Sequence, residues 1–114
     1  MHELSIVYDV IEQVEAAAIR HGFKKVNQIH LLVGEWSGVD VEALQFCFPE
    51  ATRKTCLKDA HLLITCKGLT IQCLDCFESA PISREQALAC AKCGSVNTKI
   101  IEGKELRIVD LDVD

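Results

Sequence analysis

The chain has 114 residues, of which 49% are apolar and 25% charged, and acidic residues outnumber basic ones 17 to 12. This is ordinary globular composition, which excludes a fully disordered chain, and the apolar runs are too short to cross a bilayer. The formal charge of −5 gives no general attraction to nucleic acid or to an anionic membrane, so neither is expected as a partner. The first residues lack a signal-peptide pattern, and we therefore expect the protein in the cytoplasm.

The chain begins with a pattern that predicts a helix followed by a strand. Apolar residues recur with helical spacing over residues 4–21, and Gly22 follows as a C-cap. Residues 26–33 then alternate as in a half-buried strand and are rich in β-branched side chains. A loop with two glycines comes next.

A second helix is predicted after this loop. Asp40 is a suitable N-cap for a helix that begins at Val41. Pro49 lacks a backbone N–H, so we expect this helix to kink or stop near Phe48. The segment through Cys56 is expected to continue it as a second helical piece.

Two further predicted strands, at 61–66 and 106–113, flank a segment of different composition. Residues 67–103 carry four of the seven cysteines. We therefore expect an α+β domain of residues 1–66 and 104–114, in which two helices cover one face of a small three-stranded sheet. Residues 67–103 would form an inserted, zinc-ribbon-like four-cysteine domain.

Two C-x-x-C pairs dominate the insert. They are Cys73 with Cys76 and Cys90 with Cys93, and this spacing is close to that of four-cysteine zinc sites. Zn²⁺ takes four thiolates in a tetrahedron, and Gly94 suits the tight turn after the second pair. Because the insert is too short to build its own core, metal binding would supply its folding energy. The alternative is a pair of redox-active dithiols.

The other three cysteines, Cys47, Cys56 and Cys66, are interpreted as small buried hydrophobic residues, which is how free cysteine most often occurs. The remaining histidines, His21, His30 and His61, show no ligand-like spacing. We interpret them as surface or sheet residues.

The N-terminal sequence Met1-His2-Glu3 has the chemistry of a chelator. If Met1 keeps its free amine, that amine, the backbone nitrogen of His2 and its imidazole Nδ1 can bind one ion in fused five- and six-membered rings. Ni(II) and Cu(II) favour such nitrogen donors in square-planar or tetragonal geometry, and Glu3 could supply a further ligand. The alternative is a solvated His2, with Glu3 stabilising the start of the first helix.

Taken together, Met-His-Glu at the N-terminus, Gly34-Glu35 after the first strand and the two C-x-x-C pairs make the whole chain resemble the HypA/HybF family of nickel metallochaperones for [NiFe]-hydrogenase maturation. The resemblance implies nickel bound through His2 and the adjacent Met1 and Glu3, joined by a loop carboxylate that Asp40 would provide. It also implies structural zinc held by the four paired cysteines. The implied partners are the HypB GTPase and the hydrogenase large-subunit precursor.

The sequence thus predicts a nickel metallochaperone that is not an enzyme, because no nucleophile–base pair or phosphate-binding loop is visible. Some family members carry a histidine after each C-x-x-C that exchanges with cysteine at the zinc, whereas this chain has Phe77 and Gly94 there. One alternative function is a zinc-ribbon module that binds protein or nucleic acid, although the charges of the insert balance. The other is a thiol-redox protein.

Overall fold

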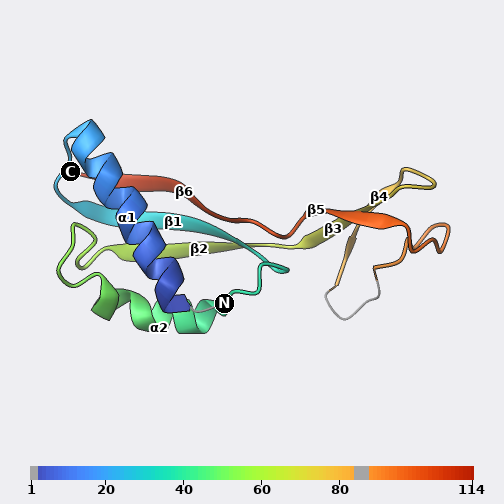
Figure 1. Cartoon of the computed structure of the whole chain (residues 1–114), viewed down its shortest axis with the longest axis horizontal. Helices are drawn as coiled ribbons and strands as arrows, with labels where there is room; N and C mark the ends of the chain where they lie inside the picture. Colours follow the sequence, from blue (N-terminus) through green and yellow to red (C-terminus); the bar gives the residue numbers. More distant parts are fainter. Residues whose placement is uncertain (1–2, 84–87) are drawn as a thin grey trace. The chain divides into compact units, whose positions relative to one another are not determined.

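The computed structural model describes residues 3–83 and 88–114 and divides into two compact units. The core unit comprises Met1–Leu31, Val39–Thr65 and Arg107–Asp114, and the cysteine unit comprises Leu32–Gly38 and Cys66–Leu106. Figure 1 shows the helices and the strands of each unit. Within the described residues, no helix is both long enough and apolar enough to span a membrane.

The first helix, α1, spans Glu3–His21 and confirms the predicted helix. Its apolar side buries Ile6, Val7, Val10 and Val14. Gly22 ends the helix as expected: it has a φ of 77°, and its N–H donates to the Ala18 carbonyl at 2.8 Å.

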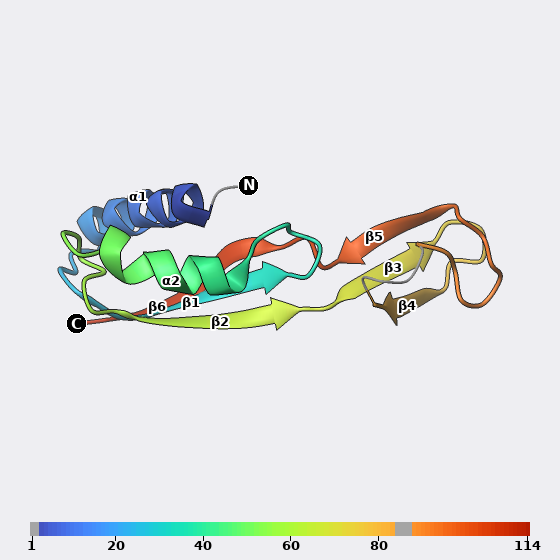
Figure 2. The same ribbon diagram turned by 90° about the horizontal axis from the view of Figure 1, so that it is seen from below.

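The core unit has the predicted three-stranded sheet, in the order β2-β1-β6. Strand β1 (Val26–Gly34) is central, and β2 (His61–Lys67) and β6 (Leu106–Val113) lie on either side of it. In Figure 2, β1 and β2 run in the same direction, and α1 and α2 cover the same face of the sheet. The expected α+β fold is therefore confirmed.

The second helix, α2, spans Val41–Ala51 and begins where the sequence predicted. The helix passes through Pro49 and ends at Ala51, three residues beyond the stop that was expected near Phe48 if the helix did not kink there. Pro49 cannot bond the Gln45 carbonyl, but both residues are exposed, so water can replace that bond. At the C-terminus, the N–H and hydroxyl of Thr52 both donate to the Phe48 carbonyl, at 3.0 and 2.8 Å.

The prediction of a second helical piece through Cys56 is wrong. Residues 52–59 form successive turns, in which the N–H of Thr55 bonds the Thr52 carbonyl and that of Lys58 bonds the Thr55 carbonyl. The Thr55 hydroxyl also donates to the Thr52 carbonyl at 2.8 Å, and such side-chain bonds compete with a helical ladder.

The cysteine unit has a sheet of its own, with the order β4-β3-β5 and antiparallel pairing. Its strands are β3 (Leu69–Cys73), β4 (Ser79–Ile82) and β5 (Thr98–Glu102). Leu69, Ile71 and Cys73 are buried on one face of β3. Cys73 is the last residue of β3, so the burial of this face fixes the position of its side chain at the start of the following turn.

The base of the cysteine unit is a close backbone crossing. The N–H groups of Gly34, Glu35 and Trp36 donate to the carbonyls of Glu105, Lys67 and Gly103, at 2.6, 2.8 and 2.6 Å. A Cβ on Gly34 would collide with the Gly103 carbonyl, so only glycine fits there. This crossing holds the two ends of the cysteine-containing segment together.

Candidate metal centres

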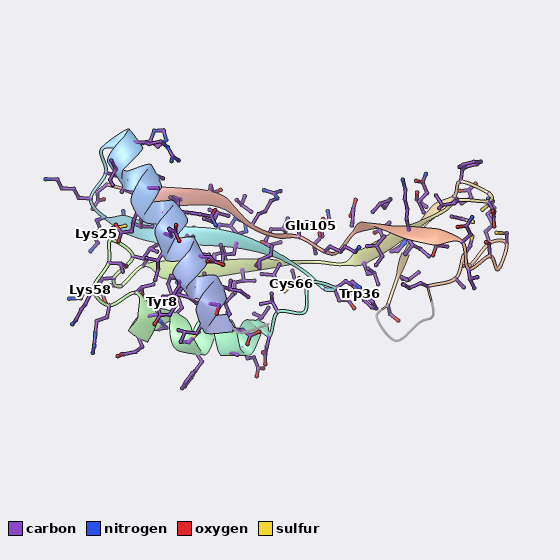
Figure 3. All side chains as sticks on the ribbon, viewed as in Figure 1. Tyr8, Lys25, Trp36, Lys58, Cys66 and Glu105 are labelled. Atoms are coloured by element: carbon purple, nitrogen blue, oxygen red, sulfur yellow. The ribbon has the colours of Figure 1, made fainter. Side chains whose placement is uncertain are left out.

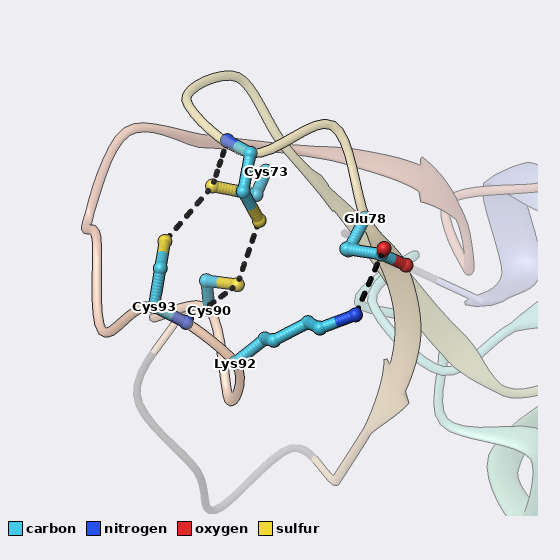
Figure 4. A network of polar contacts seen from close by, with 6 residues as sticks. Cys73, Glu78, Cys90, Lys92 and Cys93 are labelled. Carbon is cyan, nitrogen blue, oxygen red and sulfur yellow. Dashed lines mark hydrogen bonds and ion pairs between the residues drawn. The ribbon is translucent and has the colours of Figure 1, made fainter.

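The four paired cysteines form one cluster, in which all ligand sulfurs lie within 4.8 Å of one another. The Sγ atoms of Cys73 and Cys93, and those of Cys76 and Cys90, are 3.6 Å apart (Figure 4). A tetrahedral Zn²⁺ ion with Zn–S bonds of about 2.3 Å would separate its sulfurs by about 3.8 Å. The donor set and its spacing therefore fit zinc.

Both cysteine pairs are shaped by the same tight turn. The N–H of Phe77 donates to the Cys73 carbonyl at 3.0 Å, and the N–H of Gly94 donates to the Cys90 carbonyl at 2.9 Å. Phe77 and Gly94 have φ values of 63° and 77°. Gly94 was expected to allow a tight turn after the second cysteine pair, and its positive φ confirms this. Phe77 adopts the same left-handed backbone conformation, which is unfavourable for a bulky side chain.

Backbone N–H groups donate hydrogen bonds to two of the four sulfurs and lower the pKa of these thiols. The Cys76 N–H is the main cause of a lowered pKa for the Cys73 thiol, to which it donates at 3.4 Å. In the same way, the N–H groups of Cys93 and Lys92 lower the pKa of Cys90 to about 6. Hydrogen bonds to the charged form favour the thiolate, which is the form that binds metal.

Cys93 shows the opposite change. The Ser95 amide alone would lower its pKa, but the Cys73 thiol, burial and the neighbouring thiols together raise the pKa of Cys93 to about 12. Close thiols cannot all ionise in the absence of a cation. A bound metal ion must therefore displace protons from part of the cluster.

Of the four residues predicted to bind nickel, Glu3 and Asp40 lie within the described structure, whereas Met1 and His2 lie outside it. The structure brings Glu3 and Asp40 together, because the Asp40 N–H donates to Glu3 Oε2 at 3.1 Å. Asp40 is also the N-cap of α2, since its Oδ1 accepts from the Ala43 N–H at 3.2 Å. The Glu3 carboxylate thus contacts the backbone of Asp40, whose own carboxylate caps α2.

The expected burial of the other cysteines is only partly right. Cys47 and Cys56 are half-buried, but Cys66 is exposed (Figure 3). Burial, followed by the charge of Glu15, raises the pKa of Cys56. His30, interpreted as a sheet residue, has its Nε2 2.6 Å from the Thr65 hydroxyl on the neighbouring strand.

Several polar residues around the cysteine cluster were missed in the sequence. Asp75 accepts hydrogen bonds from the Ser95 hydroxyl and the Asn97 side chain, and both lower the pKa of Asp75. Lys92 forms an ion pair with Glu78 at 3.0 Å (Figure 4). The sequence does contain one signal for these residues: Asp75 and Lys92 each occupy the third position of a C-x-x-C motif, and both are charged.

Comparison with known proteins gives one consistent family. Residues 1–113 match the family model described as "Hydrogenase/urease nickel incorporation, metallochaperone, hypA". Similar curated proteins include the hydrogenase maturation factor HypA of Syntrophus aciditrophicus, 39% identical, and that of Prosthecochloris aestuarii, 36% identical. Both alignments cover 100% of each chain.

Solved structures agree with these relatives. A solution structure of a HypA protein superposes with a TM-score of 0.74 and 29% identity, over 99% of this chain and 96% of that one. The Ni metallochaperone HypA from Helicobacter pylori, also solved in solution, superposes with a TM-score of 0.73 and 28% identity. That match covers 99% of this chain and 97% of the other.

Proposed function

Because the chain belongs to the HypA family of nickel-incorporation metallochaperones, we propose that it binds Ni(II) at its N-terminus and delivers it to the [NiFe]-hydrogenase large-subunit precursor. Family membership favours nickel handling over the zinc-ribbon interaction module and the thiol-redox protein. Nickel as cargo and zinc as a structural ion, the cofactors predicted from the sequence, are those of the family.

The proposed nickel ligands are the Met1 amine, the backbone nitrogen and imidazole of His2, and a carboxylate from Glu3 or Asp40. The observation that carries this proposal is the hydrogen bond between the Asp40 N–H and Glu3 Oε2. This contact supports the proposal, because it brings Asp40, which carries a second carboxylate, next to the residue that follows His2 in the sequence. Nitrogen donors with one or two oxygens suit Ni(II).

The proposed zinc ligands are Cys73, Cys76, Cys90 and Cys93. When bound, the zinc ion ties the two cysteine turns together and stabilises the unit that contains them. The chain's own part is to hold four sulfurs at a spacing that fits a tetrahedral ion and to donate backbone N–H groups to Cys73 and Cys90, which lowers the pKa of both thiols and favours their thiolate form.

The proposed partner for nickel transfer is the HypB GTPase, which we expect to contact α1 near the N-terminus. Three exposed apolar side chains support this site, with exposed fractions of 43% for Leu4, 55% for Tyr8 and 88% for Phe46. Aromatic side chains of this kind often dominate the energy of protein interfaces. Deletion of residues 70–100 should weaken GTPase binding less than substitution of Tyr8.

A nickel titration of zinc-loaded protein with a native N-terminus tests the proposal. We expect about one nickel ion per chain besides zinc, and loss of tight nickel binding in His2→Ala with zinc retained. Affinity should fall as the pH drops from about 7 to 6, because imidazole binds only when neutral. His61→Ala, which removes an exposed histidine, is the matched control and should bind nickel normally.

One residue added before Met1 sharpens this experiment. The extension converts the terminal amine into a peptide nitrogen, whereas an ordinary imidazole site would hardly change. We expect a large loss of affinity and a changed absorption spectrum. Equal affinity and an identical spectrum in the extended and native proteins would exclude the amine as a ligand.

A further inference from the structure

The third residue of each C-x-x-C turn carries a side chain that reaches the other turn. In the first turn, Asp75 accepts from the Ser95 hydroxyl and from Asn97 Nδ2, the latter at 3.3 Å. In the second turn, Lys92 donates from Nζ to Glu78 Oε1 at 3.0 Å (Figure 4). We name the first contact the Asp75 brace (Asp75, Ser95, Asn97) and the second the Lys92 brace (Lys92, Glu78).

The two braces are equivalent by position. Ser95 and Glu78 each lie two residues after the last cysteine of their own turn. The backbone repeats this symmetry, because the Cys73 N–H bonds the Glu78 carbonyl and the Cys90 N–H bonds the Ser95 carbonyl, each at 2.9 Å. The residue that receives each brace is therefore anchored to a ligand of its own turn.

We infer that Asp75 and Lys92 are positioning residues of the zinc site, which cross-link the two cysteine turns and slow the release of zinc. The inference rests on the zinc site proposed above. Removal of zinc by a chelator requires the thiolates of both turns to leave the ion, and contacts between the turns oppose their separation. Hydrogen-bonded groups around metal ligands commonly tune metal affinity by about 10- to 100-fold.

The Asp75 brace should contribute more than the Lys92 brace. Its carboxylate receives two donors, and the Asp75 N–H also donates to the Cys73 sulfur at 3.4 Å. One residue thus links a ligand of the first turn to the segment after the second. Asp75 is exposed as well, but Lys92 and Glu78 share only one contact, an ion pair between side chains that are 69% and 52% exposed, and exposed ion pairs contribute little.

The rate of zinc transfer from the full-length, zinc-loaded protein to excess 4-(2-pyridylazo)resorcinol tests this inference. We expect release to be about tenfold faster in Asp75→Ala, near the lower end of such effects. Asp75→Asn should lie between wild type and Asp75→Ala, because the amide keeps the size but loses the charge. Lys92→Ala should change the rate by about twofold or less. Asp110→Ala removes an exposed aspartate of β6 and should release zinc at the wild-type rate.

A double-mutant cycle separates the brace from a general loss of stability. If Asp75 acts through Ser95, the double variant Asp75→Ala/Ser95→Ala should release zinc no faster than Asp75→Ala alone. Effects that multiply would overturn the inference. Should Asp75→Ala not fold, Asp75→Asn and Ser95→Ala carry the same test. Cobalt-substituted variants should keep the wild-type thiolate absorption, and loss of that absorption would mean a lost ligand and would also overturn it.

The outcomes also separate this inference from the proposed function. Wild-type protein that binds no stoichiometric zinc would overturn the zinc site and the braces together. Wild-type protein that binds zinc, with all brace variants releasing it at the wild-type rate, would overturn the braces alone.

Discussion

Asp40 combines two tasks in one side chain. Its Oδ1 caps α2 through the Ala43 N–H, while its own N–H holds the Glu3 carboxylate. The cap was predictable from local sequence, because Asp precedes the helical pattern that begins at Val41. The contact with Glu3 was not predictable, since it joins residues 37 positions apart and depends on how α1 and α2 pack.

Two substitutions of Asp40 separate its tasks. Asparagine is an equally good N-cap, so Asp40→Asn should change the free energy of unfolding by less than about 0.5 kcal/mol, whereas Asp40→Ala should cost about 1 kcal/mol. If the carboxylate binds nickel, both variants should lose nickel affinity. Chemical denaturation and nickel titration of both variants measure this. Wild-type nickel affinity in Asp40→Asn would leave Asp40 as a cap alone.

Cys66 shows where a residue-level pattern misleads. Cys66 follows Leu62 and Ile64 by four and two positions, so all three side chains are expected on the same side of β2. Leu62 and Ile64 are half-buried, and this pattern favoured burial of Cys66 as well. However, Leu62 and Ile64 belong to the core unit, whereas Cys66 belongs to the cysteine unit and is exposed. Alternation along a strand predicts which side a residue faces but not whether anything covers that side.

At the level of elements, long periodic segments were predictable and short ones were not. The apolar period identified α1, β1 and β6, each at least eight residues long. The strands of the insert have only four or five residues, and β4 contains Pro81. Pro81 is tolerated because β4 is an edge strand in the order β4-β3-β5.

Gly34 offers a test of the backbone crossing at the end of β1. Gly34→Ala places a Cβ against the Gly103 carbonyl, and overpacking of this kind typically costs about 1–3 kcal/mol. We expect a lower melting temperature and easier loss of zinc. Gly68→Ala is the matched control, because no atom lies within 4 Å of its Cβ position. It should be neutral in the same thermal denaturation, and equal losses in both variants would contradict the steric explanation.

On the scale of the whole molecule, the two units depend on metal to different degrees. The core unit buries many aliphatic side chains, including Val7, Val14, Ile29, Leu31 and Leu44, each of which contributes about 1.5–3 kcal/mol. Among its described residues, the cysteine unit buries only three aliphatic side chains, Val33, Leu69 and Ile71. The four-cysteine site was predictable from spacing, but its braces were not, because they require the folded turns.

Removal of zinc should therefore unfold one unit and spare the other. Protons compete with zinc for thiolates, and the lowered pKa values of Cys73 and Cys90, the latter about 6, reduce this competition. We expect zinc to be retained at pH 7 and released progressively as the pH falls below about 6. Hydrogen exchange with a chelator at pH 7 should then show protection lost in residues 69–102 and kept in α1 and β1.

The same experiment tests the domain boundaries that the sequence predicted, namely 1–66 with 104–114 around an insert of 67–103. Cys66→Ser, which alters an exposed cysteine outside the cluster, should behave as wild type, whereas Cys93→Ser should resemble the chelated protein. Simultaneous loss of protection in α1 would show that the chain unfolds as a single unit.

The position of β6 in the sheet has a consequence for how the chain folds. Strand β6 pairs with β1 only after the intervening polypeptide has turned back, and closing a long loop costs conformational entropy before any contact repays it. A zinc ion that joins Cys73 to Cys93 shortens the free loop between β2 and β6. Zinc binding should therefore speed the pairing of β6 with β1, although the ion does not contact β6. Refolding in the presence of a chelator should be slower at the step in which β6 joins the sheet.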